Sequence, residues 1–186
     1  MRGLGWAPDA VPTLKNGSTV GIPSPPAVLM PTGAVIKPDI RDAERLQGFP
    51  EDWTATAAEG RRNARRWGLV GNAVTVPVAQ WVARRLAAPG EYRGDLDAPE
   101  RWTRWPRAAR GDRSGRTAVR IGPFPEFVGR EPLHAFLNHP GEPLSVRATR
   151  GFLRRTDTSS LRFRDGFRER VRAHLEAMQR AGIAAE

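Results

Sequence analysis

The chain contains no cysteine among its 186 residues, and this absence limits both its fold and its chemistry. Disulfides, thiolate zinc sites and a cysteine nucleophile are excluded within these residues. The fold must therefore rest on an apolar core, and a hydrophobic content of 39% is enough for one domain with or without an appendage. We expect no metal site, because the three histidines lack the close spacing of metal ligands: His134, His139 and His174.

The formal net charge is +10, and only Lys15 and Lys37 among the 30 basic residues are not arginine. Because guanidinium groups pair bidentately with phosphates and guanine edges, this excess favours a nucleic-acid partner. A GC-rich genome also favours arginine codons, which explains the ratio of arginine to lysine but not the net excess. No apolar stretch reaches the ~20 residues of a membrane span, and the N-terminus has no secretory h-region, so we expect a cytoplasmic protein.

Local patterns predict a hairpin and a short helix near the N-terminus. Residues 27–30 and 34–36 are short apolar runs on either side of a Pro-Thr-Gly turn, which is typical of a β-hairpin. Asp39 is a suitable N-cap for a helix from Ile40 to Gln47, and Gly48 is expected to end that helix.

A longer helix is predicted at residues 77–88, with Thr75 as its cap. Its apolar stripe at helical spacing consists of Val78, Trp81, Val82 and Leu86. Residues 89–117 mix Pro, Gly, Asp and Arg, and we expect a linker or surface arm there. Residues 118–186 are expected to be mostly helical. The expected helices in this part lie at about residues 132–138, 146–155 and 165–180.

Two segments about twenty residues apart carry the strongest functional signal. Residues 41–50 read Arg-Asp-Ala-Glu-Arg-Leu-Gln-Gly-Phe-Pro, and residues 71–79 read Gly-Asn-Ala-Val-Thr-Val-Pro-Val-Ala. In this order and at this spacing they resemble the last two conserved blocks, nine and ten, of the DNA cytosine C5-methyltransferase family. Residues 12–15 and 24–27 also look like the end of that family's target-recognition region. The resemblance covers roughly residues 10–88.

The resemblance implies an architecture as well as a division of the chain. Residues 1–40 would end the target-recognition region, and residues 41–88 would hold the conserved blocks. Residues 89–117 would then lead, as the linker, to a C-terminal extension at residues 118–186, outside the family core. The expected fold class is α/β, as the C-terminal fragment of a Rossmann-like, S-adenosylmethionine-dependent methyltransferase. The helix at residues 77–88 should pack on a catalytic sheet that these residues do not contain.

Departures from the family pattern are small within the blocks and large outside them. Asp39 and Asp42 stand where the family has threonine and glutamate, and they keep a cap and an acidic first turn. Residues 75–77 read Thr-Val-Pro in place of three prolines. The family's Pro-Cys nucleophile, its glutamate and Arg-x-Arg blocks and its Gly-rich cofactor block are missing, because the chain starts too late to contain them. We therefore expect no catalytic residue here and no methyl transfer by the isolated chain.

The resemblance implies that Asn72, Ala73 and Val74 line the pocket of S-adenosylmethionine. A side-chain amide and the N–H groups of a helix start suit the methionine carboxylate. An Asx-type turn that only caps the helix is the alternative. Arg41 would be a buried organiser of the recognition region or a contact to the DNA backbone. We expect the basic run before block ten to face DNA phosphates, or else to form a solvated helix face: Arg61, Arg62, Arg65 and Arg66.

Two functions remain open at this point. The chain is either the C-terminal part or a subunit of a DNA cytosine C5-methyltransferase, acting on double-stranded DNA in a restriction–modification setting. A partner chain would then supply the Pro-Cys block and most of the cofactor site. The alternative is a non-catalytic DNA-binding or regulatory protein, or a remnant of such an enzyme, which keeps the blocks as scaffold. Chance similarity in an unrelated basic domain is disfavoured by the family-like spacing of the paired blocks.

Overall fold

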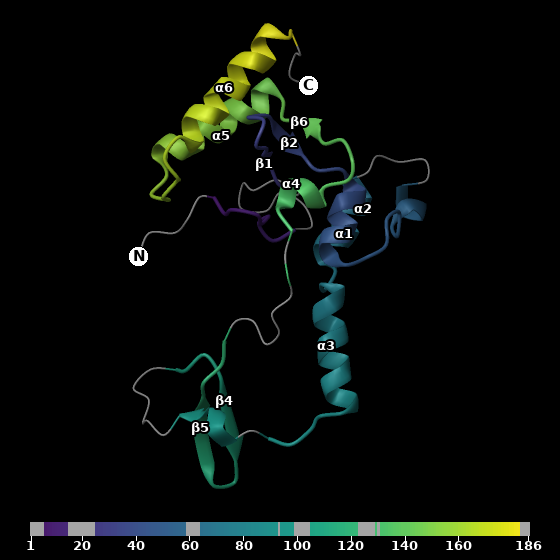
Figure 1. Ribbon diagram of the computed structural model, residues 1–186, viewed down its shortest axis with the longest axis vertical. Coiled ribbons are helices and arrows are strands. Elements are labelled where there is room, and N and C mark those ends of the chain that lie inside the picture. The colour runs from purple at the N-terminus through teal and green to yellow at the C-terminus, as the bar shows by residue number, and fades with distance from the viewer. Residues whose placement is uncertain are drawn as a thin grey trace. The chain divides into compact units, whose positions relative to one another are not determined.

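The computed structural model describes residues 6–14, 25–58, 64–92, 94–98, 105–122, 129 and 131–182. The chain divides into two compact units (Figure 1). The larger unit comprises Met1–Ala79 and Glu131–Glu186, and the smaller unit comprises Gln80–Arg130. Helices and short strands occur together along the chain, so the predicted mixture of α and β structure is confirmed.

A small antiparallel sheet begins the larger unit. Strands β1 (Val28–Leu29) and β2 (Val35–Lys37) form the hairpin that the sequence predicts. The turn between them is closed by a hydrogen bond from Met30 N to Ala34 O of 2.8 Å. Gly33 adopts a φ of 91° in this turn, a conformation that L side chains rarely adopt.

The third strand of this sheet comes from the far end of the chain. Strand β6 (Glu142–Pro143) pairs with β2 to give the order β1-β2-β6. The ammonium group of Lys37 lies 2.7 Å from the carboxylate of its register partner Glu142. Gly141 passes so close to β2 that a Cβ added to it would clash with the side chain of Ile36. The hairpin is therefore completed by residues more than 100 positions away in the sequence.

Two C-terminal helices form the main core with this sheet. The predicted helices are confirmed as α5 (Val146–Thr158) and α6 (Phe167–Arg180), which pack on each other. Their buried contacts include residues from β2 and from the segment after β6: Val35, Leu144, Leu153 and Val171. His174 of α6 joins the parts of this core, because its Nδ1 accepts from Val35 N at 3.3 Å and its Nε2 donates to the Leu144 carbonyl at 3.0 Å.

A second core in the larger unit lies around α1 (Ile40–Gln47) and α2 (Ala64–Asn72). The N-cap and the end of α1 follow the prediction. The Asp39 side chain accepts from Arg41 N, and Gly48 is left-handed with a φ of 85°. The buried apolar side chains of this core are Leu14, Ile40, Ala43 and Val70. Two short helices, η2 (Ala55–Ala58) and α4 (Leu133–Phe136), complete the unit.

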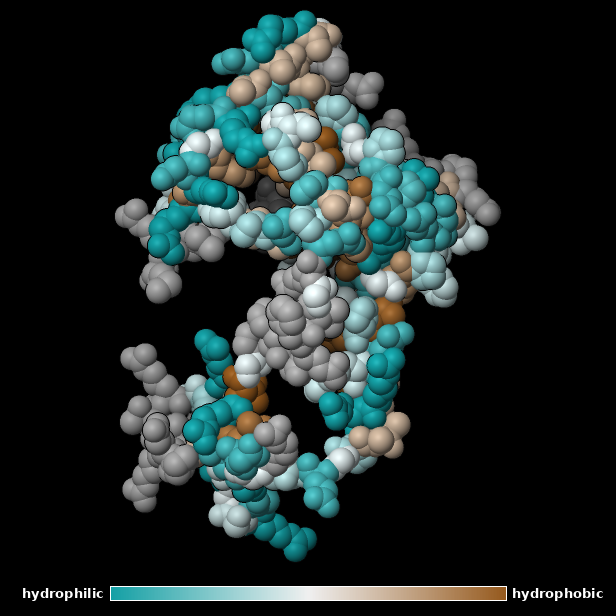
Figure 2. Space-filling view, viewed as in Figure 1, coloured by the Kyte–Doolittle hydropathy of each residue, from teal (hydrophilic) through white to brown (hydrophobic). Residues whose placement is uncertain are grey.

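Helix α3 (Val76–Ala87) agrees with the predicted long helix and contains the boundary between the two units. Three members of its predicted stripe are strongly exposed, namely Val78 (55%), Val82 (43%) and Leu86 (78%). Figure 2 shows hydrophobic residues beside hydrophilic ones along this helix. Much of the apolar face of α3 is therefore exposed in the described part of the chain.

The smaller unit contains regular strands, whereas the sequence predicts a linker or surface arm at residues 89–117. It carries a three-stranded antiparallel sheet of β3 (Asp97–Ala98), β4 (Ala109–Asp112) and β5 (Gly115–Val119), in the order β3-β5-β4. A short helix, η3 (Gly94–Leu96), precedes it. Composition alone does not reveal this sheet, because its strands are short and contain few apolar residues. Trp102, one of the two tryptophans in this segment, lies outside the described residues.

Both sheets in the described part of the chain are antiparallel. The parallel sheet of a Rossmann-like domain is therefore not part of these residues, and the assignment to such a domain stays a prediction. No helix in the described ranges is long and apolar enough to cross a membrane.

Candidate functional site

The three residues predicted to touch a cofactor lie on the connection between α2 and α3. Asn72 is the last residue of α2, and Ala73 N donates to Val70 O at 3.3 Å. Val74 is 67% exposed, Asn72 is also exposed and Ala73 is half-buried. The predicted Gly-Asn turn is therefore the end of a helix, and Asn72 and Val74 are exposed there.

The amide of Gln47 ties this connection to α1. Its Nε2 donates to Val70 O at 3.0 Å and to Ala73 O at 3.4 Å. Its Oε1 accepts from the hydroxyl of Thr75 at 2.7 Å. Thr75 precedes α3 as predicted, but its hydroxyl bonds to Gln47 rather than to the start of the helix. One buried side chain from block nine thus contacts the chain on both sides of Val74, through backbone carbonyls before it and the Thr75 hydroxyl after it.

Gly48 and Pro77 bring the two blocks into direct contact. A Cβ added to Gly48 would lie 2.6 Å from Cδ of Pro77 and 3.2 Å from Cβ of Val76. The glycine is therefore required for two reasons, since its φ of 85° ends α1 and its missing side chain admits the first turn of α3. The sequence predicted only the first of these roles.

A buried ion-pair network fixes α2 against α1. Glu44 is fully buried, and its carboxylate accepts from Arg66 Nη2 at 3.1 and 3.2 Å and from Thr54 N at 2.9 Å. The hydroxyl of Thr54 also donates to Glu44 and accepts from Arg66 Nε at 3.1 Å. Asp52 binds the same guanidinium at 2.9 Å. Nε and Nη2 of Arg66 are both directed to these partners, so the network has a structural role.

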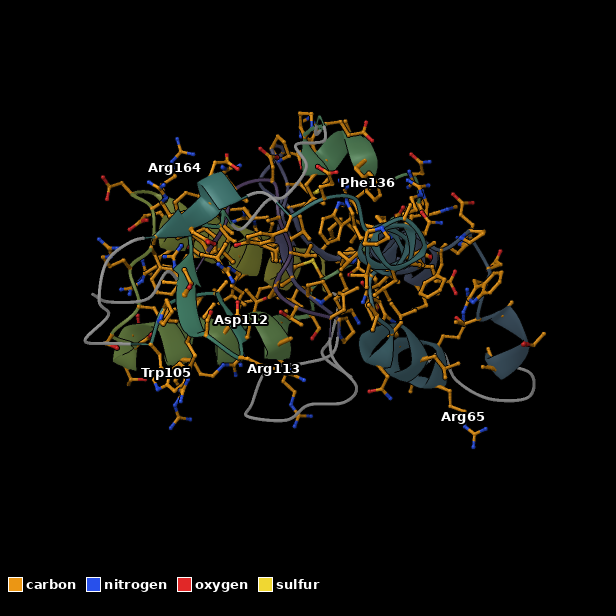
Figure 3. The ribbon with its side chains drawn as sticks, turned by 90° about the horizontal axis from the view of Figure 1, so that it is seen from below. Arg65, Trp105, Asp112, Arg113, Phe136 and Arg164 are labelled. Carbon is orange, nitrogen blue, oxygen red and sulfur yellow. The ribbon has the colours of Figure 1, made fainter. Side chains whose placement is uncertain are left out.

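This network corrects the prediction that Arg66 faces DNA. The side chain of Arg66 is 9% exposed, whereas its neighbour Arg65 is exposed and points away from the chain (Figure 3). Adjacent residues on a helix point about 100° apart. The buried carboxylate of Glu44 also requires a cation on the inner face. Arg61 and Arg62 lie outside the described residues.

Arg41 is half-buried at the start of α1 and pairs with the N-cap residue. Its Nε lies 2.9 Å from Oδ1 of Asp39, and its Nη2 lies 3.3 Å from Oδ2. This hydrogen bond holds the pKa of the Asp39 carboxyl below its usual value, and it raises the pKa of Arg41. In this structure Arg41 is therefore paired with the cap of α1, and its roles as an organiser of the recognition region or a contact to the DNA backbone stay predictions.

Block nine also holds the C-terminal part of the larger unit. Asp42 is fully buried and accepts from Asn138 N and His139 N, both at 3.0 Å. Arg45 Nη1 donates to Asp42 and to Phe136 O, both at 2.7 Å, and its guanidinium lies 4.4 Å from the centroid of the Phe136 ring. The sequence placed Asp42 only in an acidic first turn. Its main partners are amides nearly 100 residues away.

A shallow hollow of about 220 Å³ opens beside the candidate connection. Its lining includes Phe49 of block nine, Ala73 of block ten and the exposed side chains of Trp53 and Leu69. Phe49 and Trp53 stack with ring centroids 5.9 Å apart. The hollow thus offers an apolar and aromatic surface next to the exposed end of α2.

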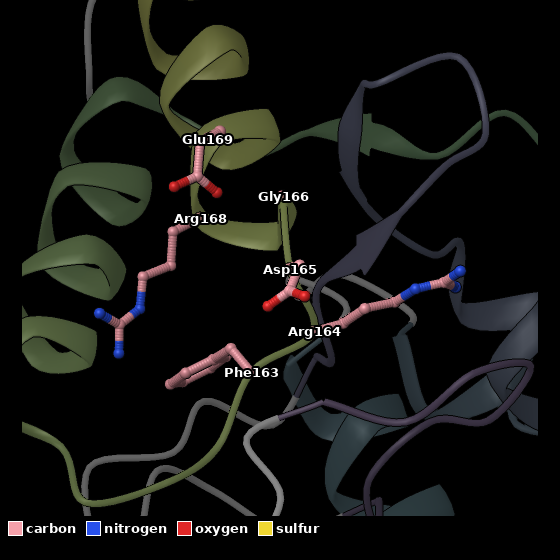
Figure 4. Close-up of a pocket in the computed structure, with 6 residues that line it drawn as sticks. All are labelled: Phe163, Arg164, Asp165, Gly166, Arg168 and Glu169. Atoms are coloured by element: carbon pink, nitrogen blue, oxygen red, sulfur yellow. The ribbon is translucent and has the colours of Figure 1, made fainter.

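A second hollow, of about 370 Å³, lies at the start of α6 (Figure 4). Its lining contains none of the residues predicted to bind the cofactor or DNA. Its charged lining combines both signs: Arg164, Asp165, Arg168 and Glu169. Arg168 is itself held by the Thr156 carbonyl at 2.9 Å and by the ring of Phe163. The lining of this hollow therefore has as many positive as negative side chains, and it does not favour a ligand of either charge.

The chain matches no model of a known protein family and no solved structure. It is 44% identical over 159 residues to the type II methyltransferase M2.BsuMI of Bacillus subtilis (strain 168). The similarity covers 83% of this chain and 41% of the relative, so the chain spans about two fifths of the relative's length.

This match extends beyond the region that the two blocks define. Residues 1–117 make up less than two thirds of the chain, so similarity over 83% must include part of residues 118–186. That segment, predicted to lie outside the family core, is thus shared in part with the relative. The predicted resemblance is confirmed at this level, since most of this chain is homologous to the C-terminal portion of a type II methyltransferase.

Proposed function

We propose that the chain forms the C-terminal part of a DNA cytosine C5-methyltransferase and completes its S-adenosylmethionine pocket. The observation that carries the proposal is the joining of blocks nine and ten. Gln47 and Gly48 of the first block contact the second on either side of residues 72–74, of which Asn72 and Val74 are exposed and Ala73 is half-buried. Homology to a type II methyltransferase supports methyl transfer as the reaction class.

The chemistry of the connection fits a zwitterionic methyl donor. Asn72 offers an exposed amide with two donors and an acceptor, and α3 begins four residues later with the positive end of its dipole. The apolar hollow beside Ala73 adds a surface that a ligand with an aromatic or aliphatic portion can cover. Bound S-adenosylmethionine would supply the methyl group, and Asn72 with its two neighbours would orient the donor from one side.

The nucleophile must come from outside these 186 residues, because a thiolate is needed to attack cytosine and the chain has no cysteine. It would lie elsewhere on a longer polypeptide or on a partner chain. The exposed side chains of Val78, Val82 and Leu86 support this arrangement, since they offer α3 as a contact for a missing catalytic domain.

Double-stranded DNA is the proposed substrate, with its target base flipped out of the duplex. Within the basic run before block ten, the exposed Arg65 is suited to a backbone phosphate, and Arg61 and Arg62 stay proposed contacts of the same kind. Arg41, held by Asp39, would contribute by positioning α1.

The test is transfer of labelled methyl groups from S-adenosylmethionine to duplex DNA. The chain is assayed alone and together with a protein that carries the Pro-Cys and Gly-rich blocks. We expect activity only in the mixture, and Asn72→Ala should raise KM for S-adenosylmethionine more than KM for DNA. Arg147→Ala, at an exposed position on α5, serves as the control. Activity of the chain alone would contradict the assignment of the nucleophile.

The second candidate is a non-catalytic DNA-binding or regulatory protein, or a remnant of such an enzyme. The observation that favours it is that block nine is bound into the larger unit by structural contacts, from Glu44 to Arg66, from Gln47 to the connection before α3 and from Asp42 to Asn138. Failure of every mixture to methylate DNA, together with binding of duplex DNA by the chain, would select this function.

A further inference from the structure

The β4–β5 hairpin of the smaller unit is a regular two-stranded ribbon with a tight turn. Its strands pair from Ala109 with Ala118 to Asp112 with Gly115. The Asp112 carboxylate accepts from Ser114 N at 2.8 Å and from the Ser114 hydroxyl, which closes the turn. Strand β3 pairs with β5 and supports the base of the ribbon. The position of the turn is therefore fixed by side-chain and backbone hydrogen bonds.

Positive charge is concentrated in this unit. Gln80–Arg130 contains eleven arginines and six acidic residues, so this quarter of the chain carries half of the net charge of +10. Within the described residues 105–122 there are five arginines and one acidic residue, Asp112. An excess of this kind on a short ribbon creates a local positive potential.

A single arginine pairs with two carboxylates of this sheet, one on β3 and one at the end of β4. Arg110 lies 2.9 Å from the Asp97 carboxylate and 2.7 Å from the Asp112 carboxylate. Its guanidinium also lies 5.2 Å from the centroid of the Tyr92 ring. Hydrogen bonds to Arg110 and Tyr92 lower the pKa of Asp97, and those to Ser114 and Arg110 lower the pKa of Asp112, so both stay ionised and paired.

The arginines at the end of the ribbon are exposed and are available to bind another molecule. Arg113 lies in the turn and points away from the ribbon (Figure 3), and Arg116 stands opposite Gly111 in the register, where no side chain covers it. Both are exposed, and neither forms an ion pair with any residue in the described part of the chain. Of the arginines in the described residues 105–122, only Arg110 forms ion pairs, and Arg113 and Arg116 are the unpaired arginines at the end of the ribbon.

We propose that the end of the β4–β5 hairpin, through Arg113 and Arg116, is a contact site for the phosphate backbone of duplex DNA. The guanidinium group matches phosphate geometry, and a two-stranded ribbon is narrow enough to lie along the major groove, which is about 12 Å wide. An acidic protein surface is a less suitable partner, because the ribbon end has few apolar side chains to bury in such an interface. The inference does not depend on methyl transfer by the chain.

The test compares two pairs of substitutions that remove equal charge. Arg113→Ala with Arg116→Ala alters the ribbon, and Arg150→Ala with Arg154→Ala alters exposed positions on α5. Fluorescence anisotropy measures the affinity of the full chain for a duplex of about 25 base pairs at several salt concentrations. We expect the ribbon pair to lower affinity at least about tenfold at 0.1 M salt and to reduce the slope of log K against log salt by about 1.8. The control pair should change the affinity and the salt slope much less.

Two further measurements make the result decisive. Arg113→Lys with Arg116→Lys keeps the charge, so the salt slope should stay close to that of the unaltered chain. Circular dichroism of each variant reports whether the fold is retained. Equal losses from the two alanine pairs, or no binding of duplex DNA by the unaltered chain, would overturn the proposal. Because binding is measured without a catalytic partner, failure here is distinct from failure of methyl transfer.

Discussion

Arginine has opposite roles in the two units. In the larger unit, Arg66 is buried and bound to Glu44, Asp52 and Thr54. In the smaller unit, Arg113 and Arg116 are exposed and form no ion pair within the described residues, where Arg110 pairs with the nearby carboxylates. The difference shows that a basic run does not by itself mark a nucleic-acid surface. An arginine of such a run is available to nucleic acid only where no buried carboxylate of the same protein binds it.

The largest effect is expected from breaking the buried pair. Arg66→Ala leaves the Glu44 carboxylate buried without its cation, which should lower the free energy of unfolding by about 3–5 kcal/mol. Arg65→Ala is the matched control on the next residue, and its effect should stay within about 0.5 kcal/mol. Urea unfolding measures both, and similar values for the two variants would contradict the assignment of Arg66 to the interior.

A smaller effect is expected at the amide that joins the blocks. Gln47→Ala removes the partners of Val70 O, Ala73 O and the Thr75 hydroxyl, and should cost about 1–3 kcal/mol of unfolding free energy. The amides of residues 72–75 should also exchange hydrogen faster, because the connection loses its internal support. Gln80→Ala, at an exposed position on α3, is the control. Unchanged exchange at residues 72–75 would show that Gln47 does not position the connection.

The cap of α1 should contribute less and depend on pH. Asp39→Ala removes the acceptor for Arg41 N and should cost about 1 kcal/mol at neutral pH. Because the folded protein lowers the pKa of Asp39 below its usual value of 3.8, its contribution is present above that pH and is lost as the pH falls further. The difference in the free energy of unfolding between Asp39→Ala and the unaltered chain should therefore stay constant from pH 7 to about pH 3.8 and shrink at lower pH. Unfolding of the two proteins at each pH measures this difference, and a difference that stays constant at lower pH would exclude the ionised cap.

The smallest effect on stability is expected from the ribbon end. Arg113→Ala with Arg116→Ala should change the free energy of unfolding by no more than about 0.5 kcal/mol, because both side chains are exposed and unpaired within the described residues. The same variant should lose DNA affinity. Thermal unfolding followed by circular dichroism measures the first quantity. A large loss of stability would place these arginines in the fold, like Arg66.

Prediction from the sequence succeeded where the signal was local. The hairpin turn at Gly33, the cap at Asp39 and the end of α1 at Gly48 depend on residues close in sequence. The helices α3 and α6 follow from apolar spacing of helical period. Pairings between distant segments could not be predicted in this way. Strand β6 has two residues, and nothing in them specifies β2 as a partner.

In the candidate site, too, the local sequence patterns could be predicted and the contacts between distant residues could not. The order and spacing of the two blocks are written in the sequence, and they indicate a methyltransferase segment that the homology supports. Tertiary structure alone decided that Gln47 and Gly48 hold block ten, because these contacts join residues more than 20 positions apart. It also decided which arginines are free for a ligand. Charge is fixed by the residue type, but its availability depends on which side chains the fold buries beside it.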